Sequence, residues 1–60
     1  MIEMFKCYDK IVGEILESND KEVLLRDVNE RFVNYNNTTN VKVSCYCIKN
    51  IYYLVERTEN

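Results

Sequence analysis

The chain has 60 residues, enough for a single small domain over residues 1–60 and too few for a second. Its hydrophobic content of 47% excludes a disordered chain, and its net charge of −2 argues against a dedicated nucleic-acid binder, which usually carries a strong basic stripe. A domain of this size buries only about 60% of the surface that its unfolded chain exposes, so self-association or a larger partner would add to a narrow margin of stability.

The first predicted element is an amphipathic helix over about residues 2–17. Apolar side chains recur there at intervals of three and four residues, which places them on one side of a helix. They are Met4, Phe5, Tyr8, Ile11, Val12, Ile15 and Leu16. Gly13 falls on the opposite, polar side, where it lowers helix stability by up to about 1 kcal/mol relative to Ala.

A second predicted helix covers about residues 21–36. Asp20 ends a polar interruption of the pattern and is well suited to cap this helix. The apolar side of the helix comprises Leu24, Leu25, Val28, Phe32 and Tyr35. Val23 and Val33 do not fit that side well, so a short strand over residues 22–25, with a helix only from Asp27, is an alternative.

The C-terminal third predicts an antiparallel β-hairpin with strands over about residues 41–47 and 51–57. The first strand shows a two-residue alternation, and the second is rich in β-branched and aromatic side chains. Lys49 and Asn50 separate the strands, and Asn tolerates the positive φ of a tight turn. One long helix through this stretch is the alternative, because apolar side chains there also recur at helical spacing: Val41, Cys45, Ile48, Tyr52 and Val55.

The length of the hairpin loop decides which side of the second strand faces the core. A two-residue turn would place the inner side chains of the first strand beside Tyr52, Leu54 and Glu56. A three-residue loop would place them beside Ile51, Tyr53 and Val55, and would pair only apolar groups. We therefore expect the three-residue loop.

Together these elements predict an α+β fold in which two amphipathic helices pack on one face of a C-terminal antiparallel β-hairpin. A core of this size rarely supplies more than about 3–5 kcal/mol of stability. The expected core consists of Met4, Phe5, Tyr8, Ile11, Val12, Ile15, Leu24, Leu25, Val28, Phe32, Val43, Cys45, Cys47, Tyr53 and Val55.

The residue types exclude most catalytic chemistry. The chain has no histidine, which removes the usual general base, the usual metal ligand and the nucleophile pairs that depend on histidine. One glycine is too few for a glycine-rich phosphate loop. We therefore expect a protein that is not an enzyme and that uses no cofactor.

Three cysteines, Cys7, Cys45 and Cys47, are the remaining reactive groups. A structural zinc takes four Cys or His ligands, so these thiols would hold one only if a dimer shared the metal. We interpret them as small apolar residues and expect no metal. Reduced thiols and the lack of a signal-peptide pattern favour the cytoplasm, or a host's cytoplasm if the protein is viral.

Two surfaces could carry a function. The first is the outer face and tip of the hairpin, the expected partner-binding site: Tyr46, Ile48, Lys49, Asn50, Tyr52 and Leu54. In the preferred register its apolar and aromatic members point away from the core, as they do in many binding surfaces. The second is an acidic helical face that would meet a basic partner, with Glu3, Glu14, Glu17, Asp20 and Glu22.

The expected function is that of a small non-enzymatic protein-binding module, regulatory or inhibitory, that self-associates as a homodimer and binds another protein. Compact proteins of this composition are frequent among the accessory factors of phages and other mobile elements. The alternative is a nucleic-acid-binding protein of winged-helix type, with Thr38–Asn50 as its recognition helix. No membrane partner is expected, because no apolar run has the length of a membrane span.

Overall fold

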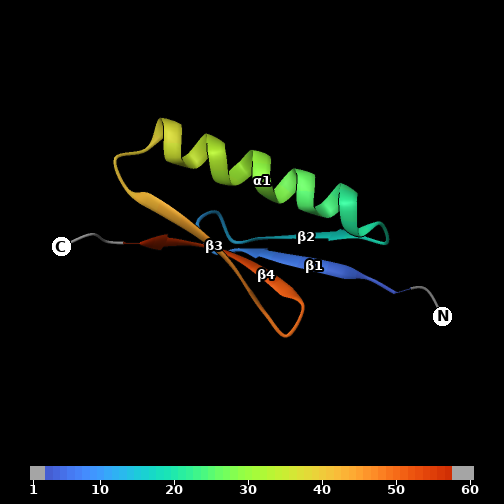
Figure 1. Cartoon of the computed structure of the whole chain (residues 1–60). Helices are drawn as coiled ribbons and strands as arrows, with labels where there is room; N and C mark the ends of the chain where they lie inside the picture. Colours follow the sequence, from blue (N-terminus) through green and yellow to red (C-terminus); the bar gives the residue numbers. More distant parts are fainter. Residues whose placement is uncertain (1–2, 58–60) are drawn as a thin grey trace.

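The computed structural model describes residues 3–57 and shows a four-stranded sheet with a helix across one face (Figure 1). The elements are β1 (Phe5–Asp9), β2 (Glu14–Ser18), α1 (Lys21–Thr38), β3 (Lys42–Ile48) and β4 (Ile51–Arg57). The sheet order is β2-β1-β4-β3, in which the central pair is parallel and both outer pairs are antiparallel. The fold is α+β, but the predicted arrangement of two helices on a C-terminal hairpin is wrong.

Residues 5–18 form a β-hairpin, which overturns the predicted helix over residues 2–17; residue 2 itself lies outside the described residues. The Asp9 side chain organises the turn, since its Oδ1 accepts hydrogen bonds from the N–H groups of Ile11 at 3.0 Å and Val12 at 3.3 Å. Gly13 closes the turn by donating to the Asp9 carbonyl at 2.9 Å. Its φ of +72° lies in the left-handed region, which a helix never uses and which glycine enters without strain.

Helix α1 begins where the sequence indicates. Asp20 is its N-cap, with the side chain accepting a hydrogen bond from the Glu22 N–H at 3.0 Å. The helix includes residues 22–25, so the alternative of a strand there is wrong. Leu24 and Val28 are its buried residues. β3 occupies residues 42–48, which also overturns the alternative of a helix over Thr38–Asn50.

The β3–β4 hairpin has a two-residue turn, and the predicted three-residue loop is wrong. Lys49 and Asn50 have φ values of 50° and 66°, as in the type I′ turns whose twist matches that of paired strands. This register places Cys45 opposite Leu54 and Tyr46 opposite Tyr53. Polar Glu56 does not prevent it, because that residue lies exposed near the end of the strand.

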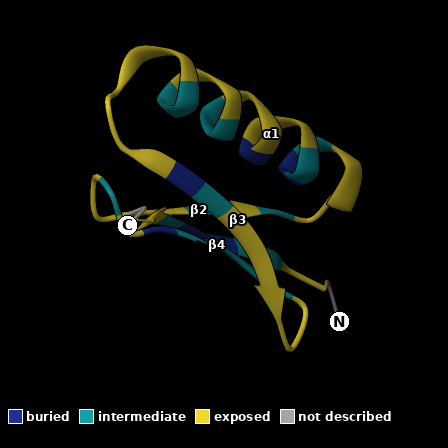
Figure 2. Cartoon of the chain, turned by 60° about the vertical axis from the view of Figure 1, so that its left-hand side comes forward, coloured by how far each residue is buried: buried dark blue, intermediate teal, exposed yellow. Residues whose placement is uncertain are grey.

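The core lies between α1 and the sheet, as the colouring by burial in Figure 2 shows. Its buried members are Cys7, Leu24, Val28, Val43 and Leu54. Three of these were predicted, whereas Cys7 and Leu54 were not. Five residues predicted to be core are instead exposed: Met4, Val12, Ile15, Cys45 and Cys47. The prediction for residues 4–16 was wrong because side chains on a strand point alternately to its two faces. Apolar residues chosen at helical spacing therefore fall on both faces of the strands.

Candidate interaction surface

The face of the sheet that points away from α1 carries no described covering element, and we call it the open face. Strand alternation defines its members, because the neighbouring positions, such as buried Cys7, Val43 and Leu54, point towards the helix. The open-face residues are Lys6, Tyr8, Ile15, Glu17, Lys42, Ser44, Tyr46, Ile48, Ile51, Tyr53, Val55 and Arg57. Two of its large apolar members, Ile15 and Ile48, are 55% and 49% exposed.

Three tyrosines form a stacked ladder across the open face, one from each of three adjacent strands. The Tyr53 ring on β4 lies 5.4 Å from the Tyr8 ring on β1 and 5.4 Å from the Tyr46 ring on β3, with interplanar angles of 29° and 15°. Since β1 and β3 flank β4 on opposite sides, the central ring is packed on both faces. The three rings therefore support one another, and Tyr46 at the end of the ladder is 37% exposed.

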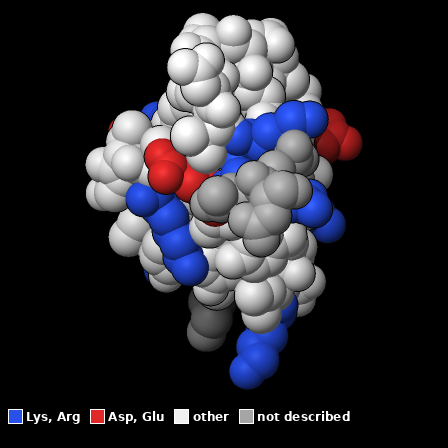
Figure 3. All heavy atoms as spheres, turned by 90° about the vertical axis from the view of Figure 1, so that its left-hand side faces the viewer, with Lys and Arg blue, Asp and Glu red and all other residues white. Residues whose placement is uncertain are grey.

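Basic side chains lie on the open face, and one of them contacts the tyrosine ladder. The Nζ atom of Lys10, in the β1–β2 turn, lies 5.1 Å from the centre of the Tyr53 ring. Lys42 and Arg57 are paired opposite each other on β3 and β4, at the end of the strands away from the turn. The described strand positions of the open face include one carboxylate, that of Glu17, which lies 3.6 Å from Lys6 Nζ. Figure 3 views the molecule from one end and shows Lys and Arg side chains, with some Asp and Glu side chains among them, around a largely uncharged surface.

The structure separates the residues predicted to bind a partner. Tyr46 and Ile48 lie on the open face, and Lys49 and Asn50 form the exposed turn. Tyr52 and Leu54 lie on the helix side, where Leu54 is 0% exposed and unavailable to a partner. Whether the exposed members bind a partner stays a prediction.

Sequence reasoning missed Tyr8 and Tyr53 as surface residues. Tyr8 was assigned to a helical stripe, and Tyr53 was placed in the core by the three-residue loop. The positive φ values that Lys49 and Asn50 adopt belong to a two-residue turn, and Asn50 was the available signal for it. That turn alone puts Tyr53 beside Tyr46.

The predicted acidic helical face does not form, because its members fall on different elements. Glu14 lies on β2 and pairs with Arg31 at 2.8 Å. Glu17 lies on the open face beside Lys6, and Asp20 caps α1. These carboxylates are used within the fold and do not make one binding surface.

A buried polar cluster at the end of β1 is fully paired. Asp9 is 1% exposed, and its Oδ2 accepts hydrogen bonds from Arg31 Nη1 at 2.8 Å and the Tyr35 hydroxyl at 2.6 Å. Burial raises the pKa of Asp9, but the bonds from Tyr35, Arg31 and the turn N–H groups outweigh it and hold the pKa below its usual range. The same bond to Asp9, together with burial, raises the pKa of Tyr35.

This cluster is unsuited to acid–base catalysis. A carboxylate has about four lone-pair positions, and Asp9 already accepts four hydrogen bonds. The guanidinium of Arg31 is bound to both Glu14 and Asp9, which raises its pKa further above neutrality. The cluster therefore joins α1 to the β1–β2 turn and leaves no oxygen position for a substrate.

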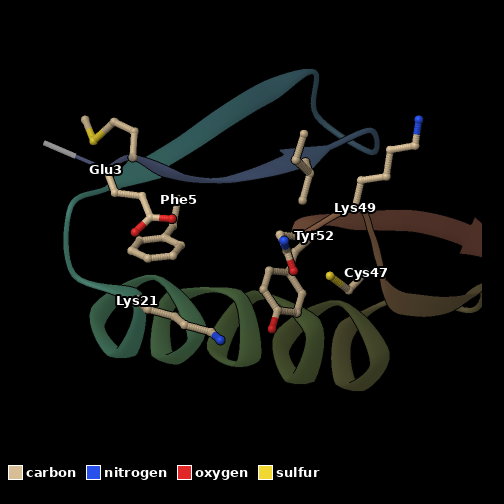
Figure 4. Close-up of a pocket in the computed structure, with 9 residues that line it drawn as sticks. Glu3, Phe5, Lys21, Cys47, Lys49 and Tyr52 are labelled. Atoms are coloured by element: carbon tan, nitrogen blue, oxygen red, sulfur yellow. The ribbon is translucent and has the colours of Figure 1, made fainter. Parts of the chain in front are cut away.

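A hollow of about 330 Å³ lies between the start of β1, the start of α1 and the β3–β4 turn (Figure 4). Figure 4 shows Phe5 and Tyr52 on two sides of it, with Cys47 next to Tyr52. Its charged residues are of both signs, with Lys21, Lys49 and Glu3 at its margin. Every buried side-chain nitrogen or oxygen among the described residues has a hydrogen-bond partner, so none awaits a ligand in this hollow.

The three cysteines are unpaired, and they differ in exposure. Cys7 is buried on β1, whereas Cys45 and Cys47 are exposed on β3. Burial, followed by the nearby Cys45 and Asp9, raises the pKa of Cys7 to about 11. Within residues 3–57 no three Cys, His, Asp or Glu side chains are grouped so that they could hold a metal ion, and the three-thiol site considered from the sequence does not form.

Comparison with protein-family models, with curated proteins and with solved structures gave no significant match. The functional argument therefore rests on this chain's own residues.

No helix among residues 3–57 has the length and hydropathy needed to cross a bilayer. Residues 3–57 contain one helix, α1, so they lack the two successive helices of a helix-turn-helix, and β3 occupies most of the stretch expected as the recognition helix of a winged-helix protein.

Proposed function

We propose that the protein is a small non-enzymatic protein-binding module, regulatory or inhibitory, whose partner docks on the open face. The observation that carries this proposal is the stacked ladder of Tyr8, Tyr53 and Tyr46 on a sheet face without a described cover. Tyrosines supply a large, amphipathic contact area, and they lose little conformational entropy when they are already packed. Aromatic residues are enriched in protein interfaces for this reason.

The stacking geometry favours a protein over a single-stranded nucleic acid. Proteins that bind single strands present ring faces on which bases stack. Here the central Tyr53 ring has a neighbouring ring on each side, so no base can stack on it without separating the ladder. The three tyrosines are partly or fully exposed, and an apolar ring with a hydroxyl group suits contact with a protein surface.

The charge around the ladder indicates the chemistry of that partner. Lys10 lies over the Tyr53 ring and Arg57 is exposed on the same face, and the single described carboxylate on these strand positions lies beside Lys6. A complementary surface would be acidic, because charges across an interface steer association and exclude partners of like charge. We therefore propose an acidic protein as the partner.

The three unpaired cysteines support a cytoplasmic site of action, or a host's cytoplasm if the chain is viral.

The test compares two charge-reversal variants of the tagged protein. Lys10→Glu with Arg57→Glu changes the open face, whereas Lys21→Glu with Arg26→Glu makes the same charge change on exposed positions of α1. Each is used to capture proteins from nuclease-treated and untreated lysate, and the captured protein is then purified for affinity measurement. We expect one acidic protein bound by the wild type and by the α1 variant, and affinity weakened about tenfold or more by the open-face variant.

Two outcomes would contradict the proposal. Equal weakening by both variants would mean that overall charge, and not the open face, governs binding. Recovery of nucleic acid only without nuclease, with no stoichiometric protein, would replace the protein partner by a nucleic acid. Circular dichroism of each variant checks that the fold survives the substitutions.

A further inference from the structure

The second half of β3 is an uncovered sheet edge. β3 is the last strand in the sheet order, and Cys45, Tyr46, Cys47 and Ile48 are all exposed. Figure 2 shows this exposed half running clear of α1 to the hairpin turn on the far side of the molecule. An uncovered edge offers backbone N–H and C=O groups to any strand that can align with it.

The Asn36 side chain identifies which backbone groups of β3 face this edge. Its Oδ1 accepts a hydrogen bond from the Val43 N–H at 2.9 Å, and its Nδ2 donates to the Val43 carbonyl at 3.2 Å. The backbone groups of Val43 therefore point away from β4. Because direction alternates along a strand, those of Cys45 and Cys47 point the same way.

The partner strand confirms this alternation. Leu54 lies opposite Cys45, yet its carbonyl accepts a hydrogen bond at 2.9 Å from the Lys10 N–H on the side of β1. Cys45 and Leu54 are thus not the hydrogen-bonded kind of antiparallel pair. Within the described residues the Asn36 side chain bonds both outward backbone groups of Val43. The corresponding groups of Cys45 and Cys47 have no such bond and face solvent.

We propose that β3 pairs in antiparallel fashion with β3 of a second copy, about a two-fold axis at Tyr46. In this register Cys45 lies opposite Cys47 of the second copy, and Tyr46 lies opposite its own equivalent. Each pair of cysteine residues exchanges an N–H···O bond in both directions, so every outward group of Cys45 and Cys47 gains a partner. The bonds from Asn36 to Val43 stay intact.

The side chains on the open face fit the same register. The tyrosine ladder has a ring on each of three adjacent strands at 5.4 Å steps, and it ends at Tyr46. Residues that face each other in a non-hydrogen-bonded antiparallel pair have Cα atoms only about 4.5 Å apart. The two Tyr46 rings would therefore meet, and the two ladders would form one continuous stack across the dimer.

The two edge strands of the sheet differ in charge. Residues 43–48 carry no charged side chain, so two copies of β3 meet without repulsion along the paired segment. The other edge strand, β2, has Glu14 and Glu17 among its five residues. Charges on an edge strand oppose pairing between copies. A β3–β3 interface also closes on itself, which limits the assembly to a dimer.

This dimer does not depend on the proposed function, because it uses the edge of β3 and its test reads only the association of the chain with itself. The first measurement is the mass in solution by analytical ultracentrifugation over a range of protein concentrations. We expect a concentration-dependent monomer–dimer equilibrium. A wild type that stays monomeric at millimolar concentration would overturn the proposal.

A proline variant tests the role of the edge. Cys45→Pro removes an outward N–H without removing a bond to β4, as proline is tolerated on edge strands with the nitrogen facing solvent. The control Cys45→Ser keeps the N–H and removes the thiol. We expect proline to raise the dimer dissociation constant about tenfold or more, and serine to leave it nearly unchanged. Equal effects of the two variants would contradict edge pairing.

Cross-linking tests the register, and it does not require the proline variant to fold. Cys45→Ser and Cys47→Ser chains each retain one exposed thiol on β3, and dibromobimane joins two neighbouring thiols. We expect covalent dimers when the two variants are mixed and few with either alone, because only the mixed pair places Cys45 opposite Cys47. Cross-linking of Cys47→Ser alone would put the axis at Cys45 and overturn the register.

Discussion

Arg31 Nη1 lies 2.8 Å from Asp9 Oδ2, across 22 positions of the chain, and this contact joins the middle of α1 to the end of β1. The second nitrogen of the same guanidinium lies 2.8 Å from Glu14 Oε1 at the start of β2. One side chain therefore holds both ends of the β1–β2 turn against the helix. Because the Asp9 side chain is 0% exposed, its charge depends on this pairing.

Replacing Arg31 by Met should unfold much of the protein. Removal of one partner from a buried ion pair costs about 3–5 kcal/mol, and we expect the lower end because the Arg31 side chain is 28% exposed. A core of this size rarely supplies more than about 3–5 kcal/mol in total. Urea unfolding followed by circular dichroism measures the loss. Arg26→Met, at an exposed position of α1, is the control and should change stability by less than about 0.5 kcal/mol.

Acid should destabilise the fold through Asp9. Its pKa is lowered in the folded state, so the contribution of this carboxylate is fully present above the usual pKa of about 3.9. As the pH falls from there through the folded-state pKa, the unfolded chain takes up the proton first and stability is lost. The urea midpoint measured between pH 7 and pH 2.5 should show this decline. For Asp9→Asn the urea midpoint should fall less steeply with pH. An unchanged slope in this variant would contradict the role of Asp9 in the acid sensitivity.

Gly13→Ala should destabilise the β1–β2 turn by about 1–2 kcal/mol, the cost of a left-handed conformation for an alanine. The strain comes from φ alone, because a Cβ atom at this position would meet no heavy atom within 4 Å. Gly13→Asn is the matched comparison and should lose less, since asparagine tolerates positive φ. Thermal unfolding of both variants measures the difference. Equal losses would show that space, and not backbone conformation, limits the position.

The thiols should react in two classes. Cys45 and Cys47 are exposed, whereas Cys7 is buried and its pKa is raised to about 11, so almost no Cys7 thiolate exists at pH 8. Burial also raises the pKa of Cys45, so we expect a maleimide at low protein concentration to modify both β3 cysteines in the folded protein, Cys47 before Cys45, and Cys7 only after unfolding. Mass spectrometry of the modified peptides distinguishes the three sites. Fast modification of Cys7 in the folded protein would contradict its burial.

The elements that sequence reasoning predicted well are those with strong local signals. Helix α1 has an N-cap at Asp20 and an apolar side long enough to recognise, and β3 and β4 are dense in residues that favour strands. The hairpin over residues 5–18 has five-residue strands, too short for an alternation to stand out against the helical spacing of the same side chains. Of the three tyrosines in the ladder, the sequence placed Tyr46 on an outer face and placed Tyr8 and Tyr53 in the core.

The sequence alone determined the position of α1, the strand character of residues 42–48 and 51–57 and the lack of histidine chemistry, because each depends on residue types or on neighbours within a few positions. Only the tertiary structure decided that residues 5–18 form strands and that Leu54 points inwards while Tyr53 points outwards. Asp9 has partners on α1, and Leu54 packs in a core built from α1, β1 and β3. Contacts so distant in the chain leave no periodic trace in the sequence, yet they placed the tyrosine ladder on the open face.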